Sequence, residues 1–348
     1  MIKPEKQFFI FGMGSRDKLI YKEGGTLTKF DTSEVLYSFD VREEKFLFDR
    51  YKVEISTKDG KIYHLYENSY GVYLENVTDK CVECLTSSDY VNLPDFEDCK
   101  YPKQLRILHH EILVSFLGDN PVPNIYVYKK PWYRDGAMMA LCLEKTKNLH
   151  LMRNWALSVT ELYDRNNKGN CEPDNLGQLA FVLSYFVDKN YPLIEKIVKK
   201  ADRISEDGLL TGLTDYNHHE IYATLWLKLA YERLNIDTSS IKIPKEFDSY
   251  ARMFWMDKND VETNTPYDNQ YCENYPYLSW AMYHFNNDEV DEKLLEIKYP
   301  MSWEIKASEA EYDKISPLSE EYAKEKCSSP HSWHAAEMFM YLIEMKHK

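Results

Sequence analysis

Residues 132–143 read Trp-Tyr-Arg-Asp-Gly-Ala-Met-Met-Ala-Leu-Cys-Leu, a short polar and aromatic cluster followed at once by an apolar run. Asp135 falls in the first turn of the helix that this run predicts, where the positive end of the helix dipole favours a carboxylate. A helix that is apolar on nearly all sides has to be buried among other helices. The stretch therefore predicts a buried helix whose polar opening faces one side of a larger helical assembly.

The same pattern, a polar or aromatic opening before an apolar run, recurs at residues 172–175, 215–220, 271–275 and 331–334. The openings start roughly 40 to 60 residues apart, which is typical of helical repeats, and amphipathic helices are expected between them. Inner and outer helices would then alternate around a circle, with all inner N-termini on one face. The predicted fold class is mainly α, with an (α/α)5–6 toroid over residues 101–348. Helices are expected near residues 104–117, 134–146, 148–163, 174–188, 191–203, 217–235, 244–256, 273–286, 317–326 and 331–346.

Residues 1–100 have a different texture, because short aromatic and β-branched runs recur along them. The clearest hairpin lies at residues 52–66, where two alternating runs flank the dipeptide Asp59-Gly60. Asp-Gly between alternating runs is a strong hairpin signal. We expect an N-terminal β-rich domain over residues 1–100, built as a small antiparallel sheet or sandwich, before the toroid domain.

The bulk composition limits the classes of partner. The formal net charge is −14, which argues against nucleic acid and against an anionic membrane surface, since both attract an excess of Lys and Arg. No signal peptide is visible, and no run approaches the roughly 20 apolar residues of a membrane helix. Seven cysteines without regular spacing do not form a disulfide framework. We expect a cytoplasmic protein with no membrane partner and no cofactor, which takes a small-molecule or oligosaccharide substrate.

Aromatic residues make up 14% of the chain, including 28 Tyr and 7 Trp. Amphipathic rings can stack on a sugar while offering a hydroxyl or N–H group. Tyr-rich helix packing explains the same composition equally well.

Residues 131–138, Pro-Trp-Tyr-Arg-Asp-Gly-Ala-Met, resemble the Trp/Tyr-Arg-Asp signature that opens an inner helix in six-hairpin glycosidases of the glucoamylase type. Residues 330–338, Pro-His-Ser-Trp-His-Ala-Ala-Glu-Met, are similar to the last inner helix of that superfamily. The resemblance covers residues 100–348 as a pattern and these two motifs at residue level. It implies a six-hairpin toroid in which Arg134 and Asp135 hydrogen-bond sugar hydroxyls. The substrate-binding residues expected are Trp132, Tyr133, Arg134, Asp135, His218, Tyr271, His331, Trp333 and His334.

Glycoside cleavage generally uses two carboxyl groups, about 5–5.5 Å apart for retention of configuration and about 6.5–9.5 Å apart for inversion. Glu172 and Asp174 flank Pro173 at a helix entrance, where helix capping explains one carboxylate readily but two less well. We take Glu172, Asp174 and Glu273 as the catalytic candidates, with Asp215 and Glu220 as further candidates for the acid. The resemblance implies that the base comes from the late region, which holds Glu304, Glu309 and Glu311, but no motif marks one of them.

The histidines allow a second interpretation. His331, His334 and Glu337 share one helix face, and two histidines with one carboxylate would suit a metal. No H-E-x-x-H motif is present, however. Polar residues at the pocket rim are the preferred interpretation, and no metal site is predicted.

The leading hypothesis is a glycoside hydrolase that acts on an oligosaccharide or glycoside by acid/base chemistry between two carboxyl groups. A polysaccharide lyase or sugar epimerase on the same fold, using Tyr and His as acid and base, is one alternative. A non-catalytic carbohydrate-binding protein is another, because a fold by itself does not determine function.

Overall fold

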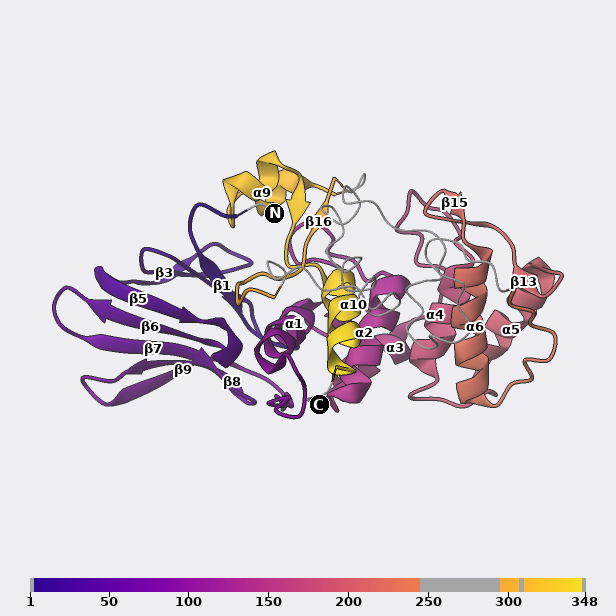
Figure 1. Ribbon diagram of the computed structural model, residues 1–348, viewed down its shortest axis with the longest axis horizontal. Coiled ribbons are helices and arrows are strands. Elements are labelled where there is room, and N and C mark those ends of the chain that lie inside the picture. Colours follow the sequence, from indigo (N-terminus) through magenta and orange to yellow (C-terminus); the bar gives the residue numbers. More distant parts are fainter. Residues whose placement is uncertain (1–2, 245–294, 307–309, 346–348) are drawn as a thin grey trace.

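The computed structural model describes residues 3–244, 295–306 and 310–345. Of these residues, 34% are helical and 23% lie in strands. The strands of the N-terminal region form two antiparallel sheets at one end of the molecule, and most of the helices stand side by side at the other end (Figure 1). The described fold is therefore mixed rather than mainly α.

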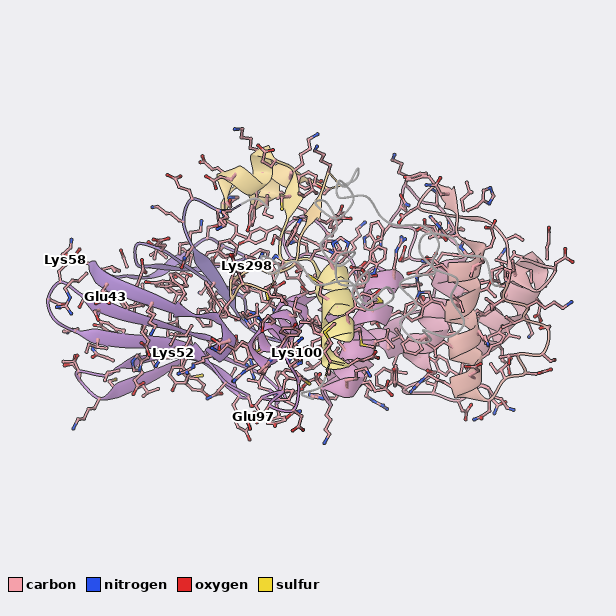
Figure 2. The ribbon with its side chains drawn as sticks, in the orientation of Figure 1. Glu43, Lys52, Lys58, Glu97, Lys100 and Lys298 are labelled. Atoms are coloured by element: carbon pink, nitrogen blue, oxygen red, sulfur yellow. The ribbon has the colours of Figure 1, made fainter. Side chains whose placement is uncertain are left out.

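The N-terminal region contains a four-stranded sheet and a five-stranded sheet, each with its strands in sequence order. The hairpin predicted around Asp59-Gly60 is confirmed: Val53 pairs with Leu65, and Gly60 has the positive φ of 85° that such a turn requires. Charged side chains such as Glu43 and Lys58 point outward from the five-stranded sheet (Figure 2). The strands are β1 Phe8–Phe11, β2 Leu19–Lys22, β3 Thr26–Lys29 and β4 Val35–Ser38 in the first sheet, and β5 Val41–Leu47, β6 Lys52–Thr57, β7 Ile62–Glu67, β8 Gly71–Asn76 and β9 Cys81–Ser87 in the second.

The helical region contains long helices, short 3-10 turns and two-stranded ribbons. The helices are α1 Pro102–Val114, α2 Tyr133–Lys145, α3 Arg153–Ser158, α4 Asp174–Leu183, α5 Pro192–Ile204, α6 Glu220–Leu234, α9 Glu320–Lys324 and α10 Ser332–Ile343, with 3-10 turns η2 Leu149–Met152 and η5 Tyr312–Ile315. A further 3-10 turn, η1 Phe48–Arg50, lies between β5 and β6 in the N-terminal region. The ribbons pair β10 Phe116–Leu117 with β11 Asn120–Pro121, β12 Ser205–Glu206 with β13 Leu209–Leu210, β14 Leu213–Thr214 with β15 Asn217–His218, and β16 Glu304–Ile305 with β17 Cys327–Ser328.

Five helices pack in a row in the order α1, α10, α2, α4 and α6, so the C-terminal helix lies between two early ones (Figure 1). The α4–α6 contact is close because Gly177 has no side chain: a Cβ atom there would lie 2.4 Å from the backbone nitrogen of Leu227. At the other end of the row, the His110 ring of α1 stacks on Phe9 of β1 with ring centroids 4.5 Å apart.

The predicted (α/α)5–6 toroid is wrong for the part of the chain that the structure describes. There the helices form an open row, with α1 and α6 at opposite ends (Figure 1). The apolar periodicity correctly marked α2, α4, α6 and α10 as buried helices, but burial on several sides is satisfied equally well by a row and by a ring. The expected helix at residues 273–286, and all but the first residue of the one at 244–256, lie outside the described residues. The boundary predicted at residue 100 stays a prediction.

The helix at residues 148–163 is shorter than expected, because it is divided into η2 and α3 and ends at Ser158. The segment after Ser158 instead contacts the start of α2: the Asp164 carboxylate accepts a 2.8 Å hydrogen bond from the backbone N–H of Tyr133, the first residue of that helix. A free N–H group at a helix start has no partner within its own helix. This carboxylate from a distant loop satisfies it.

Candidate functional site

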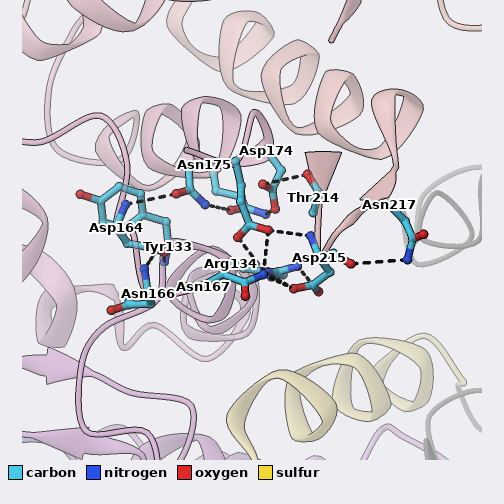
Figure 3. Close-up of polar contacts among 12 residues, drawn as sticks. Tyr133, Arg134, Asp164, Asn166, Asn167, Asp174, Asn175, Thr214, Asp215 and Asn217 are labelled. Carbon is cyan, nitrogen blue, oxygen red and sulfur yellow. Dashed lines mark hydrogen bonds and ion pairs between the residues drawn. The ribbon is translucent and has the colours of Figure 1, made fainter. Parts of the chain in front are cut away.

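The N-terminal ends of α2 and α4 meet around one buried arginine. Arg134 is 2% exposed, and its guanidinium lies 2.6 Å from an Asp215 carboxylate oxygen and 3.4 Å from a Glu172 carboxylate oxygen. The Asn167 amide donates to both carboxylates, at 3.1 Å to Glu172 and 3.0 Å to Asp215 (Figure 3). We call Arg134, Asn167, Glu172 and Asp215 the Arg134 cluster.

Asp215 reaches this cluster from a tight hairpin between β14 and β15. Asp215 and Tyr216 form its two-residue turn, and both have positive φ, 48° and 66°. This left-handed conformation is costly for residues other than glycine, asparagine and aspartate, so the strain falls on Tyr216. The backbone N–H of Asp215 donates to Glu172 at 2.6 Å, and the Asp215 side chain is 29% exposed. The hairpin thus holds Asp215 as a partly solvent-facing carboxylate of the cluster.

Glu172 and Asp174, two of the predicted catalytic residues, are buried at 2% and 0% exposure. Burial raises the pKa of both carboxyl groups, while the Arg134 guanidinium opposes the rise. Asp174 accepts hydrogen bonds from the Gln178 amide at 2.8 Å and from the Thr214 hydroxyl at 3.1 Å. The structure therefore places Asp174 in the packing between α4 and β14, and Glu172 in direct contact with the Arg134 cluster.

A second set of side chains lies where α2 and α10 begin. His331 precedes the first residue of α10, and its Nε2 atom lies 3.2 Å from a Glu304 carboxylate oxygen of β16. The Tyr128 hydroxyl is hydrogen-bonded to Glu304, and its ring lies edge-on to His331. Asp135 accepts a 3.0 Å hydrogen bond from the Ser332 hydroxyl and interacts electrostatically with His331. We call Tyr128, Asp135, Glu304 and His331 the His331 cluster.

The carboxyl groups of the His331 cluster have pKa values that diverge. Burial works against ionisation of Glu304, but His331 beside it lowers the Glu304 pKa to about 2. Burial raises the pKa of Asp135 to about 6. Burial also disfavours the charged form of His331, yet the Glu304 carboxylate raises the His331 pKa above its ordinary value of 6.5. Glu304 is thus ionised across the neutral range, and its side chain is 18% exposed.

Two tryptophans connect the clusters. The Arg134 guanidinium carbon lies 5.8 Å from the ring centroid of Trp132 and 5.2 Å from that of Trp333. The Trp333 indole N–H donates at 2.7 Å to Glu337, a carboxyl that is fully buried and whose pKa burial raises well above 4.5. Because Arg134 and Asp135 are consecutive in α2, one turn of helix supplies a charged group to each cluster.

Of the other predicted substrate-binding residues, Tyr133 and His218 lie apart from these clusters, whereas His334 lies against the His331 cluster. The Tyr133 ring is buried, and its hydroxyl donates to the backbone of Glu161. His218 is exposed and pairs with Glu220 at 2.6 Å. The His334 ring lies next to His331, with its Nδ1 atom 2.7 Å from the backbone oxygen of Trp303. Tyr271 and Glu273 lie outside the described residues.

Helix capping does not explain the polar openings of the buried helices. The residues that precede α2, α4, α6 and α10 make no side-chain capping hydrogen bond to their own helix. Asp135 and Glu172 interact with neighbouring elements, and Asp174 accepts hydrogen bonds both from Thr214 of β14 and from Gln178 of its own helix. No group of histidine, cysteine and acidic side chains suited to a metal ion occurs among residues 3–244, 295–306 and 310–345.

Sequence reasoning did not identify Tyr128 or Asn167, and it left Glu304 as one of several late carboxylates. Tyr128 carries no helical periodicity signal because it lies in an irregular segment before α2. The only hint of Asn167 in the sequence is that it lies five residues before Glu172, the residue whose carboxylate it contacts. Glu304 was undetermined because its partner His331 is far from it along the chain.

No helix in the described part of the chain combines the length and the hydrophobicity needed to cross a membrane. The resemblance to six-hairpin glycosidases is wrong at the level of the fold, because the described helices form no toroid and no family match supports it. Comparisons of this chain with protein-family models, with curated proteins and with solved structures gave no match.

Proposed function

We propose that this protein is a glycoside hydrolase that acts on an oligosaccharide or glycoside at the two adjoining clusters. The observation that carries the proposal is the divergence of carboxyl environments on one side of the helix row. Glu304 has a pKa of about 2, whereas burial raises the pKa of Glu172. Pairs of carboxyl groups whose environments separate their pKa values are characteristic of acid/base catalysis, and glycosidases use one protonated and one ionised group.

The roles follow from charge and exposure. Glu304 is ionised and partly exposed, which suits a carboxylate that activates water or attacks the sugar carbon. Asp215 is the more exposed carboxyl of the Arg134 cluster, and the nearby Asp174 acts on the same guanidinium. Burial raises the pKa of Glu172, and the charges of Asp174 and Asp215 add to that rise. We assign Glu172 as the source of the proton that the leaving oxygen receives when the glycosidic C–O bond breaks and water adds, and Asp215 as the exposed carboxyl that contacts the sugar.

Aromatic side chains next to these carboxyl groups support a sugar as the ligand. Trp132 is partly exposed, and its ring lies edge-on to Tyr128 with centroids 5.8 Å apart. Rings with one apolar face and a polar edge suit the face of a pyranose. The net charge of −14 further favours a neutral substrate over nucleic acid, and we keep a cytoplasmic location as part of the proposal.

The test is turnover of chromogenic glycosides and reducing-end oligosaccharides by the purified protein. We expect Glu304→Gln and Glu172→Gln each to lower kcat by about 100-fold to 10,000-fold, the usual contribution of an acid or base. The matched controls Glu195→Gln and Asp202→Asn change exposed carboxylates of α5 and should leave kcat unaltered. Absence of turnover on every glycoside tested, or equal activity of Glu304→Gln and the wild type, would contradict the proposal.

A lyase or epimerase is the second candidate, because Tyr128 and His331 both contact Glu304. A tyrosine and a histidine so close together suit proton abstraction next to a carboxyl or carbonyl carbon. An unsaturated product absorbs ultraviolet light, so a rise in absorbance during turnover of a uronate-containing oligosaccharide would favour the lyase. Saturable heat of sugar binding without any product would instead indicate a carbohydrate-binding protein.

A further inference from the structure

We propose that Glu111 of α1 is a positioning residue, which holds Glu304 and His331 together through the hydroxyl of Ser302. The inference rests on the proposed function in that Glu304 and His331 belong to the candidate site. Glu111 contacts neither of them. It acts on the two segments that carry them.

Glu111 is completely buried, and both of its carboxylate oxygens accept hydrogen bonds from one short segment. One oxygen accepts from the backbone N–H of Met301. The other accepts from the backbone N–H of Ser302 at 3.0 Å and from the Ser302 hydroxyl. A helix in the middle of the molecule thereby fixes the chain just before β16, the strand that begins with Glu304.

Ser302 extends the connection to the other half of the ion pair. Because its hydroxyl donates its proton to Glu111, the hydroxyl oxygen is left to accept, and it accepts the backbone N–H of His331 at 3.0 Å. These two hydrogen bonds form a chain, which we call the relay: the His331 N–H donates to the Ser302 hydroxyl, and that hydroxyl donates to the Glu111 carboxylate. Ser329 makes a separate contact, in which its hydroxyl donates to the Ser302 backbone oxygen at 2.6 Å. That bond lies outside the relay.

A carboxylate suits this position better than an amide. Three donors converge on two oxygens, and a glutamine would place its own NH2 group against some of those donors. Burial raises the pKa of Glu111 to about 7, while the three hydrogen bonds and nearby Lys298 oppose that rise. The other titratable groups that face it are Tyr299, Tyr322 and neighbouring His110. Loss of the carboxylate charge removes acceptor capacity and weakens the relay.

The experiment compares Ser302→Ala with Ser329→Ala, two buried serines that each lose one hydroxyl. The first variant breaks the relay, and the second leaves it intact. The primary measurement is the NMR titration of the His331 imidazole, assigned by comparison with His331→Gln. We expect Ser302→Ala to lower the His331 pKa toward 6.5, because the imidazole is no longer held against Glu304, and Ser329→Ala to leave it unchanged.

Kinetics supply the second measurement, using any glycoside that the wild type cleaves. Ser302→Ala should lower kcat by about tenfold or more with little change in KM, since small displacements of reacting groups cost that much. Glu111→Gln should shift the His331 pKa in the same direction and further. If it does not fold, Ser302→Ala alone still decides the question. Equal His331 titrations in Ser302→Ala and Ser329→Ala would overturn the proposal.

The two proposals fail in different ways. Absence of any glycoside turnover by the wild type would count against the hydrolase but would leave the His331 titration fully informative. Turnover with an unshifted His331 pKa in Ser302→Ala would support the hydrolase and reject Glu111 as a positioning residue.

Discussion

The Arg134 cluster and the His331 cluster are neighbours built from the same materials, yet they hold charge in different ways. Each sets two acidic side chains beside one cation near the start of a helix, and Trp132 contacts both clusters, through Arg134 in the first and Tyr128 in the second. The cation of the first is a guanidinium, which does not lose its proton in proteins. The cation of the second is an imidazole, whose charge changes near neutral pH. We infer that the charge of the cation is constant in the first cluster and changes with pH in the second.

The two cations therefore have different roles in the candidate site. Arg134 is saturated by protein carboxylates, so it fixes the position of Asp215 and Glu172 rather than presenting a free guanidinium to a ligand. His331 controls the ionisation of Glu304 directly. The residues that a sugar could reach are those at the exposed margin of each cluster, Asp215, Glu304 and Trp132.

The largest expected effect is on the Arg134 cluster. Arg134→Met should lower the free energy of unfolding by about 3–5 kcal/mol, because it leaves buried carboxylates without their cation. Urea unfolding monitored by circular dichroism measures the change. The control Lys168→Met removes an exposed cation that lies over the Tyr216 ring and should cost less than about 0.5 kcal/mol. Equal effects of the two substitutions would show that Arg134 does not hold the cluster together.

The corresponding change in the other cluster should cost less. His331→Gln removes the cation beside Glu304, but Glu304 keeps access to water and the bond from Tyr128. We expect a loss of about 1–3 kcal/mol, typical of removing one partner from a buried polar pair. The Glu304 pKa should rise well above 2, which a carbon-13 NMR titration of the carboxyl detects. A Glu304 pKa that stays near 2 would rule out His331 as its cause.

The pH dependence should separate the clusters. The folded His331 pKa is raised above 6.5, so its contribution to stability is complete below pH 6.5 and is lost as pH rises through the folded value. The folded Glu304 pKa is depressed from 4.5 to about 2, so its contribution is present above pH 4.5 and is lost as pH falls toward 2. The stability difference between the wild type and His331→Gln should therefore be largest between pH 4.5 and 6.5 and decline above it.

The matched comparison uses Arg134→Met over the same range above pH 6.5. Its stability difference from the wild type should stay level there, because guanidinium keeps its charge. If the stability differences of Arg134→Met and His331→Gln from the wild type both declined above pH 6.5, the two cations would not differ in how their charge depends on pH, and the inference would be contradicted.

The smallest expected effect concerns the strained hairpin of the Arg134 cluster. Tyr216→Gly should raise the free energy of unfolding by about 1 kcal/mol, since glycine adopts the positive φ of 66° without the cost that an L side chain carries. Tyr216→Phe keeps the strain and serves as the control. A thermal midpoint that falls in Tyr216→Gly would mean that the ring contact with Lys168 outweighs the strain.

Much of the local structure could be predicted from the sequence. The run after Trp132 predicted a helix over residues 134–146, and α2 spans Tyr133–Lys145. The polar openings correctly marked where α4, α6 and α10 begin. Asp59-Gly60 marked the hairpin of β6 and β7. These features depend on contacts between residues close in sequence, so the periodicity of side chains and the chemistry of turns were enough to find them.

The sequence by itself determined which helices are buried, where they start and which acidic and aromatic side chains stand at those starts. Only the tertiary structure decided that the described helices form an open row, that His331 lies against Glu304, and that Arg134 pairs with Asp215. Apolar periodicity indicates that a helix face is buried but does not identify the element that packs against it, because the hydrophobic effect has no direction. The ionisation of Glu304 depends on a partner brought close by folding, since electrostatic interactions act through space rather than along the chain.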